Sequence, residues 1–170
     1  MGNETRLARR LRSTSAEATA ALGEGLGKRA ERGLVVRLEG DLGAGKTCWV
    51  RGFARGLEVE DEVTSPTFAL RHDYRGRLPL LHFDAWMESR ERALLADGGA
   101  EALGGEAVAV IEWGERVEEW LPRPHLVLRL WHEDPETRRI ELEVVGEDPA
   151  GALSALVAEL ELPVGVVEVI

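Results

Sequence analysis

The eight residues GDLGAGKT at positions 40–47 constrain this chain more than any other segment. They follow a short apolar run, LVVRLEG at 34–40, and precede TCWVRGFARGL, whose apolar residues recur with helical spacing. Gly40, four further residues and then Gly45-Lys46-Thr47 match the phosphate-binding loop, a motif that is credible between a strand and a helix. The sequence therefore predicts a nucleotide-binding loop, with a plain glycine-rich turn as the alternative.

Each position of this loop has a chemical reason. Gly43 and Gly45 allow backbone N–H groups to curve around a polyphosphate at a helix N-terminus, where the partial positive charge favours anions. We expect Lys46 to reach the β and γ phosphates and Thr47 to ligate Mg²⁺, so ATP and Mg²⁺ are the expected cofactors. The residues expected around the nucleotide are Asp41, Leu42, Gly43, Ala44, Gly45, Lys46, Thr47 and Cys48.

Two strands end in acids that nucleotide hydrolysis could use. LPLLHFD ends at Asp84, and the buried run AVAVIE ends at Glu112. If both strands run parallel to the strand before the loop, both carboxylates meet at the same edge of the sheet. Glu112 is the preferred candidate for Mg²⁺ and Asp84 for orienting or deprotonating water, although these roles could be exchanged.

Two further features lie near these acids. His82 shares a strand face with Asp84 by the two-residue period, so it either contacts that acid or the substrate, or serves as a structural histidine. The segment EVTSPTF at 62–68 carries hydroxyls at Thr64, Ser65 and Thr67, which are candidates for a phosphate-sensing switch. An ordinary polar loop is an equal alternative for this segment.

The order of expected elements defines the fold class. Strands are expected at 34–40, in a hairpin over 67–84, and at 107–113, 126–131 and 138–145; helices at 14–30, after the loop, and from Asp148-Pro149 to 160. VGVVEVI at the end is an edge strand or a docking segment. The sequence predicts one α/β domain over 1–170, a three-layer P-loop NTPase fold with a mixed, mainly parallel sheet, in which 1–13 form a flexible tail.

Charge and composition limit the partners. Net charge is −10, so strong independent binding to nucleic acid is not expected, because phosphate contacts need clustered positive charge. No apolar run approaches the roughly 20 residues that cross a bilayer, and the one cysteine suits a reducing compartment. We therefore expect a cytoplasmic protein with no membrane partner.

Several motifs together resemble the TsaE (YjeE) family, the ATPase component of bacterial tRNA threonylcarbamoyladenosine synthesis. They are GDLGAGKT at 40–47, RGFARGL at 51–57, SPTF at 65–68, HFD at 82–84, IEW at 111–113 and LP at 121–122. The resemblance covers about residues 15 to 145. One departure is Ala85-Trp86-Met87 after HFD, where the family usually has Leu-Tyr-Arg.

The resemblance implies a slow ATPase that acts with a TsaD and TsaB core, which modifies adenosine 37 of tRNAs reading ANN codons. It also implies that tRNA is held by the partners, that Thr47 and Glu112 contact Mg²⁺, that Asp84 serves hydrolysis, and that Trp113 lies against the active site.

Two other functions compete with this interpretation. A small-molecule kinase would need a cationic lid, for which Arg71, Arg75 and Arg77 are the candidates. A nucleotide sensor without catalysis is the second alternative. A GTPase is disfavoured because the guanine-reading motif needs an asparagine and the only one is Asn3.

Overall fold

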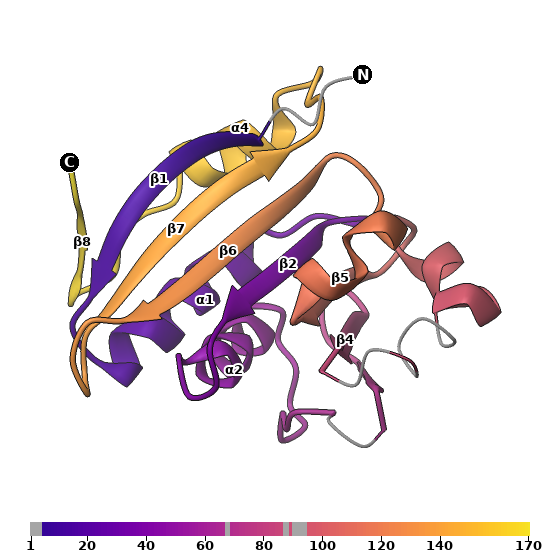
Figure 1. Ribbon diagram of the computed structural model, residues 1–170, viewed down its shortest axis with the longest axis horizontal. Coiled ribbons are helices and arrows are strands. Elements are labelled where there is room, and N and C mark those ends of the chain that lie inside the picture. The colour runs from indigo at the N-terminus through magenta and orange to yellow at the C-terminus, as the bar shows by residue number, and fades with distance from the viewer. Residues whose placement is uncertain (1–4, 67–68, 87–88, 90–94) are drawn as a thin grey trace.

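Four parallel strands form the middle of a mixed sheet, and the phosphate loop leaves the carboxyl end of one of them (Figure 1). The computed structural model describes residues 5–66, 69–86, 89 and 95–170. Within these ranges the strand order is β3-β4-β5-β2-β6-β7-β1-β8. The parallel strands are β4 (Leu80–Asp84), β5 (Val108–Glu112), β2 (Val35–Gly40) and β6 (His125–His132).

Antiparallel strands extend the sheet on both sides. β3 (Arg71–Tyr74) pairs with β4 through a hairpin, while β7 (Arg138–Val145), β1 (Thr5–Ser13) and β8 (Val166–Glu168) follow β6. Short turns join β3 to β4 and β6 to β7, and turns of that length can connect only antiparallel neighbours. The predicted α/β class and mixed sheet are confirmed, with the parallel pairings confined to the four central strands.

Helices and short helical turns cover the two faces of this sheet. One face carries α1 (Ala16–Arg29), α2 (Lys46–Gly56) and α4 (Ala152–Ala158), which share the larger apolar core with β2 and β6. The other face carries η1 (Leu95–Gly99), η2 (Ala100–Ala102) and η3 (Gly114–Trp120) over β4, β5 and the start of β2. No helix within the described ranges is long and apolar enough to cross a membrane.

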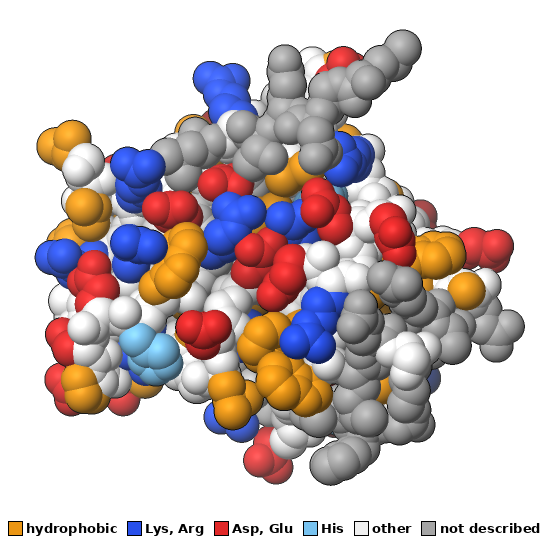
Figure 2. All heavy atoms as spheres, viewed as in Figure 1, with side chains coloured by type: hydrophobic (Ala, Val, Ile, Leu, Met, Phe, Trp, Pro, Cys, Tyr) orange, Lys and Arg blue, Asp and Glu red, His pale blue; other side chains and the backbone are white. Residues whose placement is uncertain are grey.

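Beyond these turns, the second face over β6, β7 and β1 is lined by alternating charges. Figure 2 shows basic and acidic side chains interleaved there. Arg129 pairs with Glu39 at 2.6 Å and also with Glu143, while Arg10 lies 3.4 Å from Glu141. The Arg129 pairs are mostly buried, whereas the Arg10 side chain is half exposed, so the Arg10 pair adds little to stability.

The N-terminal segment corrects a prediction. Residues 5–13 of the expected flexible tail form β1, which lies between β7 and β8; residues 1–4 lie outside the described ranges. Arg9 donates to the Val157 and Leu160 carbonyl oxygens at 3.2 and 2.8 Å and pairs with Glu168 at 3.1 Å. Arg9, Arg10 and Arg12 of this segment are therefore each paired with an acid of another segment.

The last helix also begins later than expected. Asp148 does not cap a helix at Pro149; α4 starts at Ala152 with Gly151 as N-cap, and Asp148 Oδ2 accepts from the Ser154 backbone N–H at 2.9 Å. The edge strand expected at the C-terminus is confirmed as β8.

Close contact between α1 and α2 fixes the helix that carries the phosphate loop. A Cβ at Gly52 would lie 1.8 Å from the Ala20 carbonyl oxygen, and one at Gly23 would lie 2.4 Å from that of Trp49. Neither distance leaves room for a side chain, so glycine is required by the approach of the two backbones. The helix behind the loop is thus held against a second helix as well as the sheet.

Candidate nucleotide-binding site

The loop at 40–47 has the backbone shape that an anion site needs. Gly43 and Gly45 have φ of 77° and 106°, in the left-handed region that favours glycine. α2 begins at Lys46 with Gly45 as N-cap, and no side chain caps it. The backbone N–H groups of its first turn therefore lack a side-chain acceptor, which favours a bound anion there.

Lys46 lies inside this loop and is only 6% exposed. Its Nζ donates to the carbonyl oxygens of Gly40 at 2.5 Å and Asp41 at 2.9 Å, and it lies 4.1 Å from the centroid of the Trp113 ring. Burial lowers the pKa of this amine, against the attraction of nearby carboxylates led by Glu112.

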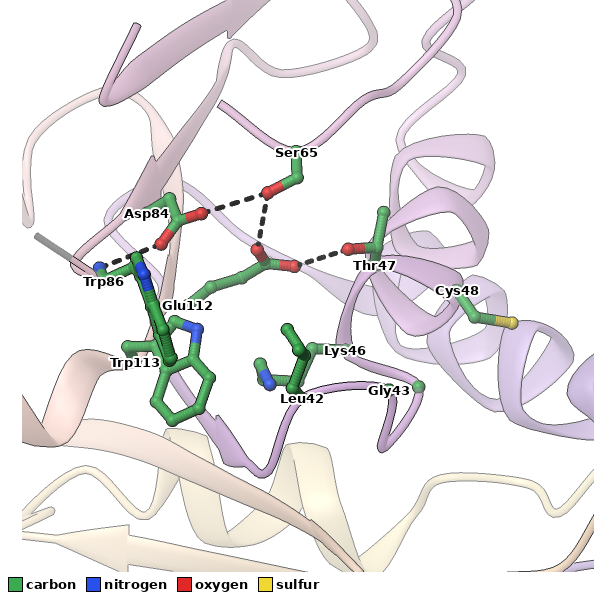
Figure 3. Close-up of a pocket in the computed structure, with 11 residues that line it drawn as sticks. Leu42, Gly43, Lys46, Thr47, Cys48, Ser65, Asp84, Trp86, Glu112 and Trp113 are labelled. Atoms are coloured by element: carbon green, nitrogen blue, oxygen red, sulfur yellow. Dashed lines mark hydrogen bonds between the residues drawn. The ribbon is translucent and has the colours of Figure 1, made fainter. Parts of the chain in front are cut away.

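Two hydroxyls and two carboxylates form a connected chain beside the loop (Figure 3). Thr47 Oγ1 donates to Glu112 Oε1 at 3.1 Å. Ser65 Oγ contacts both acids, Asp84 Oδ2 at 3.1 Å and Glu112 Oε2 at 3.2 Å. The two carboxylates meet here because β4 and β5 are parallel and in register, as the sequence predicted.

The environment of Glu112 favours its ionised form. Burial pushes the pKa of this carboxyl up, but the interactions with His82, Thr47 and Ser65 outweigh burial and hold it below the ordinary value. His82 is fully buried in β4, with Nε2 3.7 Å from Glu112 Oε1. The His82 ring thus faces Glu112 on the neighbouring strand β5.

A pocket of about 350 Å³ opens between the loop and these acids. Its lining residues are Leu42, Gly43, Gly45, Lys46, Thr47, Cys48, Ser65, Asp84, Trp86, Glu112 and Trp113. Asp41 contributes a carbonyl to Lys46 and Ala44 is buried behind the loop, so neither lines the pocket. The backbone N–H of Thr64 donates to the Tyr74 hydroxyl at 3.3 Å, outside this lining, and Thr67 lies outside the described residues.

Aromatic residues form one wall of the pocket, and part of this wall was missed by sequence reasoning. Trp113 was expected here, but Trp86 also packs against it, with ring centroids 4.6 Å apart and ring planes tilted by 60°. Arg116 lies over both rings, 5.0 and 5.3 Å from their centroids, and its Nη1 donates to the Trp86 carbonyl oxygen at 2.5 Å. The two-residue spacing from Asp84 could have placed Trp86 on the same side; nothing in the sequence pointed to Arg116.

Cys48 and two of the three candidate lid arginines have structural contacts. Cys48 Sγ donates to the Ala16 carbonyl oxygen at 3.2 Å, and burial raises the pKa of the thiol. Arg77 donates to the last carbonyls of α1, and Arg71 pairs with Asp73 at 2.5 Å. The β3–β4 turn, which includes Arg75, lies at the amino end of β4, opposite the end that carries Asp84. None of the three arginines lines the pocket.

The fold and loop together define an α/β domain of the P-loop NTPase class. The family model "Threonylcarbamoyl adenosine biosynthesis protein TsaE" matches residues 13–140. The chain belongs to this TsaE family of threonylcarbamoyladenosine biosynthesis proteins.

Individual relatives agree with this assignment. The chain is 45% identical over 118 residues to a tRNA threonylcarbamoyladenosine biosynthesis protein TsaE of Treponema pallidum, covering 69% of this chain and 87% of the relative. The Bacillus subtilis TsaE is 38% identical over 137 residues, covering 79% and 85%. The crystal structure of Bacillus subtilis YdiB superposes with a TM-score of 0.73 at 30% identity, covering 94% of this chain and 96% of that one.

Proposed function

We propose that this protein binds Mg-ATP in the pocket beside the phosphate loop and hydrolyses it slowly. This activity would support repeated turnover of a TsaD and TsaB core that forms threonylcarbamoyladenosine at position 37 of tRNAs reading ANN codons. The observation that carries the proposal is the connected chain Thr47, Glu112, Ser65 and Asp84 next to the uncapped start of α2. Membership of the TsaE family supports the pathway.

The oxygen atoms present fit a magnesium ion. Thr47 Oγ1 and Glu112 Oε1 lie 3.1 Å apart, and both are hard oxygen ligands of the kind Mg²⁺ takes. Two protein oxygens would leave the other coordination positions of Mg²⁺ to phosphate oxygens and water, as is usual for this ion. When bound, the ion would neutralise phosphate charge.

The protein's own residues would hold the nucleotide and the attacking water. Lys46 would leave its loop carbonyls to contact the β and γ phosphates, while the backbone N–H groups of the loop bind the same anion. Asp84 would orient the water. The backbone N–H of Trp86 donates to Asp84 Oδ1 at 2.9 Å and so holds the carboxylate in place. Thr64, Ser65 and Thr67 would form the segment that senses the γ-phosphate.

Partners would supply the contacts to tRNA. The chain has 31 acidic against 21 basic residues, so we assign tRNA binding to the TsaD and TsaB partners. Its single cysteine suits a reducing compartment, and we place the complex in the cytoplasm.

Phosphate release from Mg-ATP tests the proposal. It would be measured for the protein alone and with its host's TsaD and TsaB homologues plus tRNA, using Lys46→Ala and Glu112→Ala as controls. We expect slow hydrolysis that rises with the partners, multiple rounds of tRNA modification, and loss of both in the two variants. Nucleotide binding without any response of turnover or modification to the partners would refute the assigned role. Phosphate transfer to a small molecule, with no release to water, would favour a kinase.

A further inference from the structure

One arginine outside the loop motif connects the phosphate loop to the turn between β6 and β7. Arg138 Nε donates to the Ala44 carbonyl oxygen at 2.9 Å. Its Nη1 donates to three carbonyl oxygens of the turn, those of Asp134 at 2.9 Å, Thr137 at 3.1 Å and Pro135 at 3.2 Å. The turn lies at the same end of the sheet as the loop (Figure 1), so one guanidinium joins segments that are far apart in the chain.

The Ala44 carbonyl depends on this contact because it is shielded from solvent. Ala44 is only 1% exposed, and its own N–H donates within the loop to the Asp41 carbonyl oxygen at 3.0 Å. A buried carbonyl without a donor is costly, and a charged donor is stronger than a neutral one. Arg138 therefore supplies the hydrogen bond that the loop itself does not give to the buried Ala44 carbonyl oxygen.

This contact also sets the direction of the next N–H. The peptide between Ala44 and Gly45 is trans, since the cis bond of the described chain lies between Arg123 and Pro124. In a trans peptide the C=O and the N–H point in opposite directions. With the Ala44 oxygen turned to Arg138, the Gly45 N–H points away from the guanidinium, and Gly45 lines the pocket at the start of α2.

We propose that Arg138 is a positioning residue for phosphate binding, which holds the Ala44–Gly45 peptide so that the Gly45 N–H faces the polyphosphate. This inference rests on the proposed binding of Mg-ATP. The turn that holds the guanidinium is itself braced by hydrogen bonds, because Asp134 Oδ1 accepts from the backbone N–H groups of Glu136 at 2.9 Å and Thr137 at 2.7 Å. A rigid donor in this place orients the peptide before the nucleotide arrives.

The neighbouring arginine offers a matched control. Arg139 points to the opposite face of β7, where it lies 4.3 Å from the centroid of the Trp131 ring. Arg138→Met and Arg139→Met therefore remove the same charge from adjacent positions of one strand, and only the first removes the contact with Ala44. Affinity for Mg-ATP would be measured by calorimetry for both variants and the wild type, together with the unfolding temperature without ligand.

We expect Arg138→Met to bind Mg-ATP roughly ten- to a hundredfold more weakly than the wild type, and Arg139→Met to bind as the wild type does. If Arg138→Met binds Mg-ATP with wild-type affinity, whatever its unfolding temperature, the positioning role of Arg138 is overturned and the proposed function is not. Equal losses in both variants would overturn it too, because they would reflect general damage to β7. A wild-type protein that does not bind Mg-ATP would overturn the proposed function and this inference with it.

A second measurement uses the unchanged protein and so does not depend on how the variants fold. Hydrogen exchange of the Glu136 and Thr137 amides would be followed with and without saturating Mg-ATP. We expect both amides to exchange several-fold more slowly when nucleotide holds the loop against Arg138. Equal exchange in the two states would contradict the link between loop and turn.

Discussion

Asp84 and Glu112 are register partners at the ends of two parallel strands, and the Ser65 hydroxyl lies within hydrogen-bonding distance of both carboxylates. The pairing follows from strand direction, since the carboxyl ends of parallel strands meet at one edge. Two acids in this position would repel each other without a donor between them, so Ser65 contributes to the stability of the pair as well as to its geometry.

Glu112→Gln tests the metal-binding role of this pair. The amide keeps the shape of the side chain but lacks the charge that would hold Mg²⁺. We expect Mg-dependent ATP hydrolysis to fall about a hundredfold or more, with nucleotide affinity in the absence of Mg²⁺ largely kept. Single-turnover phosphate release checks the rate. Glu119→Gln, on the exposed side of η3, is the control and should keep wild-type hydrolysis; an equal loss there would argue against a specific role for Glu112.

The stability of the protein in acid should depend on the same carboxyl. The pKa of Glu112 in the folded protein lies below its ordinary value of 4.5, so the folded state binds fewer protons than the unfolded state in that range. Its contribution to the free energy of unfolding is present above about pH 4.5 and is lost as pH falls through the folded pKa. The free energy of unfolding, measured with urea from pH 6 to about pH 3, should therefore fall more steeply for the wild type than for Glu112→Gln. Parallel curves would be evidence against a lowered pKa.

Nucleotide affinity should weaken at alkaline pH because of Lys46. Burial lowers the pKa of this amine from 10.5, so it loses the charge that attracts phosphate at a lower pH than an ordinary lysine. We expect Mg-ADP affinity to decrease as pH rises toward 10, and Lys46→Met to bind roughly a hundredfold more weakly at pH 7 with no such decrease. Calorimetry across this range measures both; a decrease of the same size in Lys46→Met would assign the titration to another group.

Arg77 should matter for stability and not for nucleotide chemistry. Its Nη2 donates to the Gly27 and Ala30 carbonyl oxygens at 2.8 and 2.9 Å, at the C-terminus of α1 where a cation is favourable. We expect Arg77→Met to lower the free energy of unfolding by about 1–2 kcal/mol and to leave Mg-ATP affinity unchanged. Arg75→Met should change neither quantity. Lost turnover in Arg77→Met at unchanged stability would instead support the kinase-lid interpretation.

Gly52→Ala tests the contact between α1 and α2. Alanine usually favours a helix over glycine, but here its Cβ would lie 1.8 Å from the Ala20 carbonyl oxygen. We expect a loss of about 1–3 kcal/mol in the free energy of unfolding, because the backbones must separate. Gly25→Ala is a suitable control, since a Cβ there meets the end of the Leu160 side chain at 3.4 Å. Chemical denaturation of both variants compares them, and equal stabilities would show that the helices can move apart freely.

Local patterns predicted much of the fold and of the candidate site. The loop motif, the apolar run before Glu112 and the two-residue period up to Asp84 depend only on neighbours in the sequence, and the structure brings these residues together. Residues that act across the sheet could not be predicted in this way. Arg9 and Arg138 resemble ordinary surface arginines in sequence, and their roles come from carbonyls that lie far away along the chain.

The place of β1 in the sheet also determines when the protein can finish folding during its synthesis. Thr5 is synthesised about 140 residues before its partner Val145 on β7, and the outer neighbour β8 is made later still. Such distant pairing slows folding, and it leaves β1 of the nascent chain with unpaired backbone groups until β7 has been translated. The arginines of β1 have a second benefit in that interval, because charged side chains discourage the pairing of an exposed strand with another chain.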